Sequence, residues 1–311
     1  MKSPIKKIAI IGSGVIGSGW TIRFLANNKI VNVYDPKKSQ QKFLESEIKR
    51  ISKSVLKFYN IKKLNLNNLN FKNSIKDAVN DVDLIQENTP ENIKIKKKIV
   101  KEISKWSKQN CIIASSSSGL LPTKIQNSCI FPDRFIIAHP FNPVYLLPLV
   151  ELVRGKNTKN EIVKRCEIFY KSIGMNTLVL KKEVEGYLSD RLQESMWRES
   201  LHLLNKNLAS TDDLDKAISY GPGMRWALMG AFLTFCLAGG KHGMKHYIEQ
   251  FGPALKLPWT NLKAPNLTKK LKKRMIEGTN KQTKNKSIKQ LTTIRDNFLV
   301  DLIKLKNKYK I

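Results

Sequence analysis

A glycine-rich turn between two short apolar runs constrains this chain more than any other feature. The run Ile8–Ile11 leads into Gly12-Ser13-Gly14-Val15-Ile16-Gly17, and a helix-like apolar pattern follows. A second apolar run, Ile30–Tyr34, ends at Asp35. The order strand, tight turn, helix, strand and carboxylate is the context in which a Gly-x-Gly-x-x-Gly turn binds a dinucleotide. The sequence therefore predicts a βαβ unit with a dinucleotide site.

Each residue type in the turn has a physical reason. Gly12 lets the chain turn tightly off the strand, Gly14 lets the backbone approach a pyrophosphate, and Gly17 lets the helix pack close to the strand. Val15 and Ile16 begin the helix, where unpaired N–H groups and the positive end of the helix dipole would face the phosphates. We therefore expect all five residues to contact the cofactor.

Asp35 indicates which dinucleotide is bound. It follows Gly17 by 18 residues and stands at the tip of the second strand. A carboxylate there accepts hydrogen bonds from the ribose hydroxyls and repels a 2′-phosphate, so NAD is favoured over NADP. Lys37 and Lys38 weaken that preference slightly because they attract phosphate. The alternative, a plain strand–turn–helix with chance glycines, does not explain the acid at this distance.

Composition limits the class of protein. The 311 residues suffice for two domains, and no apolar run is long enough to span a bilayer. Because the chain runs almost directly into its first strand, we expect no signal peptide. The cysteines do not form a C-x-x-C pair; they are Cys111, Cys129, Cys166 and Cys236. We therefore expect a cytoplasmic protein without a metal site, a disulfide framework or a membrane segment.

The formal net charge of +31 raises the question of nucleic-acid binding. The basic residues are mostly lysines spread along the whole chain. Aromatic residues are not interleaved with the basic runs, as stacking platforms for bases would be. We interpret the charge as a solvated lysine coat and expect no nucleic-acid partner, although the charge could speed the arrival of anionic ligands.

The chain divides into two parts by its periodicity. Residues 5–180 alternate strand-like and helix-like segments, which is typical of a doubly wound parallel α/β sheet of the Rossmann type. Helical periodicity alone follows, with helices expected over 186–204, 226–237 and 287–309. We expect an NAD-binding Rossmann domain over 1–185 and a smaller all-helical domain over 186–311, which would bind substrate and form a homodimer.

His139 and Glu151 are the candidate acid–base residues. His139 ends an apolar strand, where ligands bind in open α/β sheets. Glu151 lies twelve residues later on the apolar segment 148–153, and a hairpin-like return brings the two side chains together. A carboxylate behind one ring nitrogen leaves the other as a general base. A structural histidine and an exposed glutamate remain the alternative.

The chain resembles the 3-hydroxyacyl-CoA dehydrogenase superfamily over nearly its full length. The matching pieces are the glycine turn, Gln86–Asn92, Ala114–Leu120, His139–Pro143 with Glu151, and Gly186–Leu192. Within the superfamily the chain resembles the L-carnitine dehydrogenase branch, on the segments Tyr220–Gly230, Ala238–Gly240, Gln250–Thr260 and Ser287–Asp296. The λ-crystallin and L-gulonate dehydrogenase branch shares the Met-Arg-aromatic segment.

The resemblance implies roles for individual residues. His139 would remove the 3-hydroxyl proton while hydride passes to NAD, and Glu151 would orient His139. Ser118 aligns with a serine that hydrogen-bonds the substrate oxygen, and Glu87 with an acid near the cofactor ribose. The family's asparagine beside the substrate is Asp190 here, a departure that suits a cationic substrate such as carnitine.

Carnitine carries a quaternary ammonium group and a carboxylate. The ammonium group requires aromatic faces and acids, for which Phe141 and Trp226 are candidates beside Asp190. Arg225 is the candidate for the carboxylate, because a guanidinium forms a two-pronged contact with it. The alternative activities are those of a 3-hydroxyacyl-CoA dehydrogenase or an L-gulonate 3-dehydrogenase.

Overall fold

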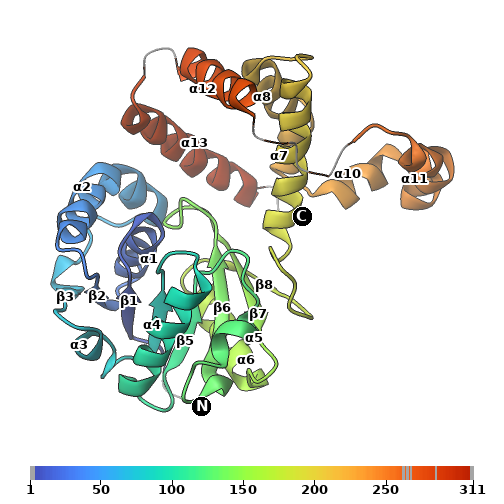
Figure 1. Ribbon diagram of the computed structural model, residues 1–311. Helices are drawn as coiled ribbons and strands as arrows, with labels where there is room; N and C mark the ends of the chain where they lie inside the picture. The colour runs from blue at the N-terminus through green and yellow to red at the C-terminus, as the bar shows by residue number, and fades with distance from the viewer. Residues whose placement is uncertain (1–3, 261–262, 264–265, 267, 284–285, 309–311) are drawn as a thin grey trace. The chain divides into compact units, whose positions relative to one another are not determined.

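The computed structural model describes residues 4–260, 263, 266, 268–283 and 286–308, and forms two compact units, residues 1–190 and 191–311 (Figure 1). Each unit has its own arrangement of elements. The expected end of the last helix at Tyr309 lies outside the described residues, as does the chain before Pro4.

The first unit is built on one eight-stranded sheet with the order β3-β2-β1-β4-β5-β6-β7-β8. The strands are β1 Lys7–Ile11, β2 Ile30–Tyr34, β3 Leu69–Phe71, β4 Leu84–Glu87, β5 Ile112–Ser115, β6 Phe135–Pro140, β7 Leu149–Arg154 and β8 Asn176–Val179. All neighbours pair in parallel except β6 and β7, which pair antiparallel. The predicted doubly wound Rossmann-type sheet is thereby confirmed, and the antiparallel pair is the expected hairpin-like return.

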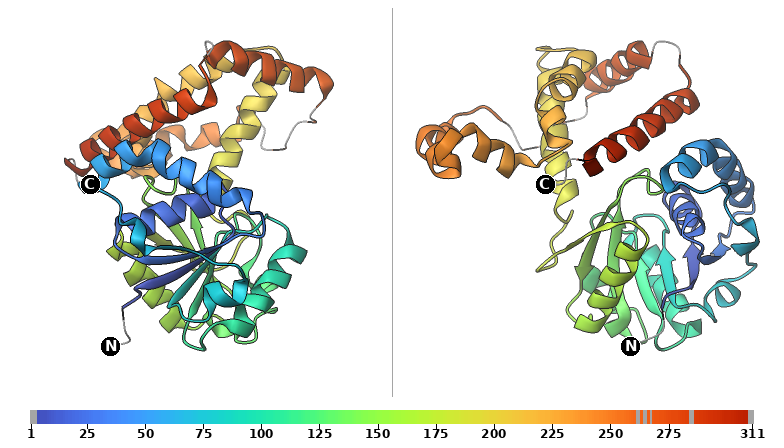
Figure 2. Two further views of the ribbon diagram at one scale, coloured as in Figure 1. Left: turned by 90° about the vertical axis from the view of Figure 1, so that its left-hand side faces the viewer. Right: turned by 180° about the vertical axis from the view of Figure 1, so that it is seen from behind.

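Helices cover both faces of this sheet (Figure 2). They are α1 Val15–Ala26, α2 Ser39–Tyr59, α3 Ile75–Val79, α4 Ile93–Trp106, α5 Pro122–Gln126 and α6 Asn160–Ser172, with short 3-10 turns η1 Leu66–Asn68 and η2 Pro132–Arg134. Apolar side chains of α3, α4 and α5 share one core with those of β1, β4, β5 and β6. On the other face, the rings of Trp20 on α1 and Tyr170 on α6 pack 5.4 Å apart. The inner strands are covered on both faces, which explains why their sequences are continuous apolar runs.

The helix expected from Gly186 begins three residues later, at Ser189. Gly186 has a φ of +71° and Tyr187 a φ of +46°, both in the left-handed region that helices exclude. The chain therefore makes a tight turn before α7, which directs Tyr187 and Asp190 toward the carboxyl end of β6. This turn positions two of the side chains that lie beside His139.

The second unit is helical over its described residues. It contains α7 Ser189–Asn205, which starts in the first unit, and then α8 Thr211–Ser219, α9 Pro222–Trp226, α10 Ala231–Ala238, η3 Gly240–His242, α11 Gly243–Phe251, η4 Gly252–Lys256, α12 Lys269–Thr283 and α13 Ile288–Lys308. The helix expected over 226–237 is interrupted, because Gly230 adopts an extended conformation and starts α10 as its N-cap. Among the described residues, none of the helices is long and apolar enough to cross a membrane.

Candidate active site

The glycine turn forms a cradle at the carboxyl end of β1. Gly12 has a φ of +87°, and a Cβ on it would lie 2.9 Å from the carbonyl oxygen of Asn88. A Cβ on Gly17 would lie 1.9 Å from the carbonyl oxygen of Gly12, so the helix can pack here only on glycine. A Cβ on Gly14 would meet nothing within 4 Å. The space beside Gly14 is open, as an approaching pyrophosphate requires.

The start of α1 offers unused donors to that space. Gly14 is its N-cap, and no side chain caps the helix. The first amides of α1, on Val15 and Ile16, are therefore available to phosphate oxygens, together with the positive end of the helix dipole. The residues present fit a dinucleotide whose pyrophosphate rests on this helix.

Asp35 stands beside the turn, at the end of β2. Its carboxylate accepts hydrogen bonds from the backbone N–H of Ser13 at 2.8 Å and of Lys37 at 2.9 Å. The amide of Gly12 also donates to the carbonyl of Tyr34, at 2.9 Å. These bonds hold the carboxylate next to the cradle, where the adenosine ribose of a dinucleotide would lie in this fold.

Glu87 ends β4 and is completely buried. Its carboxylate accepts two hydrogen bonds of 3.1 Å from Nζ of the buried Lys96, and further bonds from Thr89 and the hydroxyl of Ser115. A buried charge pair needs such additional bonds to offset the loss of hydration. The expected contact of Glu87 with the ribose stays a prediction, because the carboxylate is here bound to protein groups.

A second acid, Glu91, was not assigned a role from the sequence. Its Oε1 accepts hydrogen bonds from the amides of Ser118, Gly119 and Leu120 at 3.1, 3.0 and 3.3 Å, and from the hydroxyl of Ser117 at 2.6 Å. Burial raises the pKa of this carboxyl, but these bonds and the nearby Lys96 outweigh burial and hold the pKa below its usual value. Glu91 thus fixes the loop that carries Ser118.

His139 and Glu151 face each other across the antiparallel pair of β6 and β7. They are register partners in the sheet, and Nδ1 of His139 lies 2.9 Å from Oε2 of Glu151. Both side chains are buried. The register of β6 and β7 therefore places the two side chains next to each other without help from any loop.

The other oxygen of Glu151 is also occupied. It accepts hydrogen bonds from the amides of Leu188 and Ser189, at 3.1 and 3.0 Å, and from the Ser189 hydroxyl at 3.1 Å. Burial raises the pKa of Glu151, but the bonds from His139, Ser189 and Leu188 outweigh it and lower the pKa below its usual value. An ionised Glu151 can only accept at Nδ1, so His139 carries a proton there and Nε2 is left as the basic nitrogen.

Three further side chains lie beside the imidazole of His139. Oδ2 of Asp190 lies 3.7 Å from Nε2, and the Asp190 side chain is 27% exposed. The ring of Phe141 packs edge-on at 5.2 Å between centroids, and that of Tyr187 is tilted at 5.4 Å. The imidazole thus has an acid near its basic nitrogen and two aromatic rings packed beside it.

The remaining predicted site residues are Ser118, Arg225 and Trp226. Ser118 is exposed on the loop after β5, held by its amide on Glu91. Arg225 and Trp226 end α9 in the second unit, and their part in the site stays a prediction. Within the described part of the chain, no group of three or more His, Cys, Asp or Glu residues could hold a metal ion.

Two family comparisons decide the classification. The 3-hydroxyacyl-CoA dehydrogenase NAD binding domain matches residues 7–184, and the 3-hydroxyacyl-CoA dehydrogenase C-terminal domain matches residues 186–282. The chain belongs to the 3-hydroxyacyl-CoA dehydrogenase family. This member of the 3-hydroxyacyl-CoA dehydrogenase family is an oxidoreductase, and its cofactor is NAD.

Individual relatives are similar over nearly the whole chain. An L-carnitine dehydrogenase of Oceanobacillus iheyensis is 48% identical over 98% of this chain and 99% of its own length. An L-carnitine dehydrogenase of Bacillus cereus is 49% identical over 99% of this chain and 94% of its own length. Among solved structures, an NAD-dependent dehydrogenase of 5-formyl-3-hydroxy-2-methylpyridine 4-carboxylic acid has a TM-score of 0.80 at 26% identity, covering 97% of this chain and 99% of that chain.

The open space at Gly14 generates a test of the cofactor site. Gly14→Ala adds a methyl group where the protein has no atoms within 4 Å. We expect unchanged thermal unfolding of the free protein and an NAD affinity lower by about tenfold or more, because the methyl group takes the space of the pyrophosphate. Calorimetric titration with NAD measures the affinity.

Gly17→Ala is the matched comparison, since its Cβ would collide with protein rather than cofactor. This variant should lose thermal stability. If Gly14→Ala bound NAD as tightly as the unmodified protein, the pyrophosphate would not lie against this turn.

Proposed function

We propose that this enzyme oxidises the 3-hydroxyl group of L-carnitine to a ketone, giving 3-dehydrocarnitine and NADH. The observation that carries the proposal is the carboxylate of Asp190, 3.7 Å from the basic nitrogen of His139. An acid there suits a substrate whose reacting carbon stands close to a fixed positive charge. The relatives named L-carnitine dehydrogenase, at 48% and 49% identity, support the same substrate.

His139 is the proposed general base. Its Nε2 takes the proton of the 3-hydroxyl group as the C–H bond at C3 breaks. NAD, when bound, accepts the hydride. The imidazolium that forms is stabilised by the Glu151 carboxylate, 2.9 Å from Nδ1. The proposed role of Ser118 is to donate a hydrogen bond to the substrate oxygen from its exposed hydroxyl group.

Recognition of the two charged ends follows from their chemistry. A quaternary ammonium group has no N–H to donate, so it binds anionic groups and aromatic faces. Asp190 and Phe141 are proposed to hold it, with Trp226 as a further aromatic candidate. Arg225 is proposed to bind the carboxylate through its guanidinium group.

The activity is tested by the absorbance of NADH with L-carnitine as substrate, beside D-carnitine, 3-hydroxybutyryl-CoA and L-gulonate. We expect turnover with L-carnitine, and His139→Gln should lower kcat by roughly 10²–10⁴-fold because the proton acceptor is lost. The affinity for NAD should not change in this variant. Turnover with L-gulonate or the CoA ester but not with carnitine would overturn the substrate assignment.

Asp190 is tested by removing one charge without changing the size of the side chain. Asp190→Asn should lower kcat/KM for L-carnitine by about tenfold, since the carboxylate attracts the ammonium group at short range. The control substrate is 3-hydroxy-5,5-dimethylhexanoate, in which carbon replaces the nitrogen of carnitine, so that the positive charge is absent and the carboxylate remains. This isostere, which lacks only the positive charge, should be oxidised at least as well by the variant as by the unmodified enzyme. Equal losses with both substrates would contradict charge recognition.

We further propose that the protein acts as a homodimer. The second unit exposes large apolar side chains, among them Phe232 at 86%, and monomeric proteins rarely expose wide apolar surfaces. Several of them lie on α10 and α11, which pack on each other through Phe235 and Tyr247 and extend away from α8 and α12 (Figure 1). We call residues 231–251 the arm.

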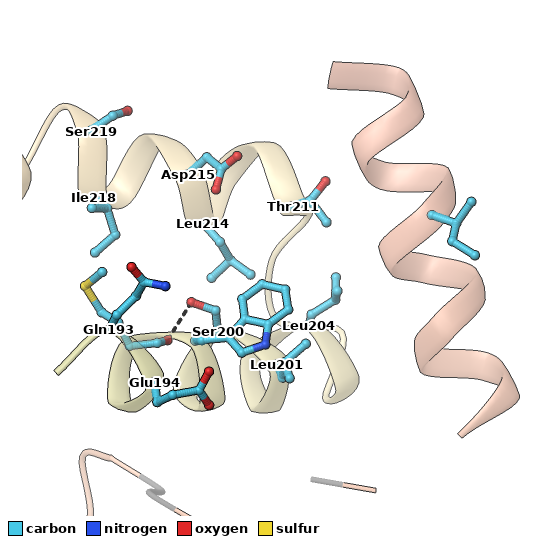
Figure 3. Close-up of a pocket in the computed structure, with 13 residues that line it drawn as sticks. Gln193, Glu194, Ser200, Leu201, Leu204, Thr211, Leu214, Asp215, Ile218 and Ser219 are labelled. Carbon is cyan, nitrogen blue, oxygen red and sulfur yellow. Dashed lines mark hydrogen bonds between the residues drawn. The ribbon is translucent and has the colours of Figure 1, made fainter. Parts of the chain in front are cut away.

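A groove in the same unit is complementary to the arm, because it is apolar and carries acidic residues. It has a volume of about 1000 Å³ and is lined by α7, α8 and α12 (Figure 3). Its apolar residues include Trp197, Leu201 and Leu214, and its charged residues are Glu194 and Asp215. The arm carries exposed apolar side chains together with the basic Lys241 and Lys245. This complementarity supports a second copy of the chain, with its arm on the groove, as the partner.

Light scattering during size-exclusion chromatography tests the dimer. We expect twice the chain mass of 35.6 kDa, and a shift toward the chain mass in Phe232→Glu, because a charge cannot be buried in an apolar contact without a partner. The control is Ile168→Glu on α6, where a residue 71% exposed lies outside the arm. A single-chain mass for the unmodified protein would overturn the proposal.

The cysteines support the proposed cytoplasmic location. All four are free thiols, and three of them are buried; the four are Cys111, Cys129, Cys166 and Cys236. Free thiols persist in a reducing compartment.

A further inference from the structure

Arg23, on α1, is a buried cation that the proposed mechanism does not use. The residue is 0% exposed, and among the described residues no carboxylate pairs with it. Burying an unpaired charge is unfavourable unless hydrogen bonds replace its hydration. Its hydrogen bonds should therefore indicate why the position holds an arginine.

The guanidinium group donates to three backbone carbonyls. Nε donates to Val144 at 2.7 Å, Nη2 to Leu147 at 3.0 Å and Nη1 to Ile173 at 3.1 Å. A guanidinium presents several N–H donors in a fixed plane, which suits carbonyls in different directions; a lysine ammonium is a compact charge that cannot reach all three. The geometry is thus specific for arginine.

Two of these carbonyls belong to residues 141–148, the segment that joins β6 to β7. This segment begins two residues after His139 and carries Phe141, whose ring lies 5.2 Å from the imidazole. It is a part of the active site that the sheet does not hold, because the strand register fixes His139 and Glu151 but ends at Pro140 and Val150.

Other contacts tie the same segment to α1 and α2. A Cβ on Gly19 of α1 would lie 2.9 Å from Cβ of Val144, so the helix touches the segment directly. The hydroxyl of Tyr59, on α2, donates to the carbonyl of Tyr145 at 3.1 Å. The guanidinium carbon of Arg23 lies 5.8 Å from the centre of the Tyr59 ring. Arg23 is the centre of this group of contacts.

We propose that Arg23 is a positioning residue that couples the cofactor helix α1 to the segment 141–148. The same helix begins at the phosphate cradle, so one rigid element holds both the cofactor and the segment beside the base. Without the contacts to the carbonyls of Val144 and Leu147 the segment loosens, and Phe141 no longer keeps its place beside His139. The kinetic part of the test rests on the proposed carnitine activity.

The first measurement needs no substrate. Arg23→Lys keeps the charge and most of the stem but loses the planar set of donors. We expect amide hydrogen exchange across 141–148 to accelerate by about tenfold or more, with exchange in the turn at residues 12–17 unchanged. If exchange across 141–148 matches the unmodified protein, the proposal is wrong whatever the kinetics.

The second measurement separates positioning from simple stability. Arg23→Lys should raise KM for L-carnitine by about tenfold, because a small displacement beside the reacting groups is costly, while the dissociation constant for NAD stays within about twofold. Arg134→Lys is the matched control. Arg134 is also buried and donates to the carbonyls of Ser104 and Cys111, but it lies at the opposite end of β6 from His139.

The control should lower the unfolding temperature and leave KM unchanged. If both variants lose stability and neither changes KM or local exchange, Arg23 has only a structural role. Should Arg23→Lys fail to fold, Arg23→Gln decides, because it removes the charge and leaves at most part of the contacts to the three carbonyls. We expect the same acceleration of exchange across 141–148, and unchanged exchange there would overturn the proposal. Absence of carnitine oxidation by the unmodified enzyme would refute the proposed function, and the exchange measurement would still decide the role of Arg23.

Discussion

The buried carboxylate of Glu151 is the group on which the rest of the site depends. One oxygen holds Nδ1 of His139 at 2.9 Å, and the other accepts three hydrogen bonds from Leu188 and Ser189. A buried carboxylate with fewer partners would take up a proton, and its partner ring would lose its fixed tautomer. One side chain thus joins the sheet to the turn that brings Asp190 toward the basic nitrogen.

The helix α1 connects the cofactor site to the loops around His139. The amino end of α1 forms the phosphate cradle, and its inner face contacts segments on both sides of β6. Trp20 donates to the hydroxyl of Ser116 at 3.0 Å, on the loop that leads to Ser118, and Arg23 reaches the segment after His139. Buried polar contacts of this kind specify one arrangement of the loops, since leaving any of these groups without a partner is unfavourable.

The sequence predicted those features whose signals are local. Local patterns predicted the glycine turn, the position of Asp35 and the parallel strands. Each of these depends on a few neighbouring residues and on buried apolar runs. The residues alone allowed two interpretations of His139 and Glu151, a catalytic pair or a structural histidine with an exposed glutamate. The strand register favours the pair, because it puts the two side chains together. The role of Glu91 could not be predicted, because three of its partners are backbone amides 27 to 29 residues away, which no side-chain pattern reveals.

The role of Glu151 is tested most directly by the turnover number of Glu151→Gln with NAD and L-carnitine. It is measured by NADH absorbance on protein shown to be folded and to bind NAD. The amide keeps the size of the side chain but removes the negative charge that fixes and stabilises His139. We expect kcat to fall by roughly 10²-fold or more. A kcat within about threefold of the unmodified enzyme would contradict the claim that the ionised carboxylate makes His139 the base.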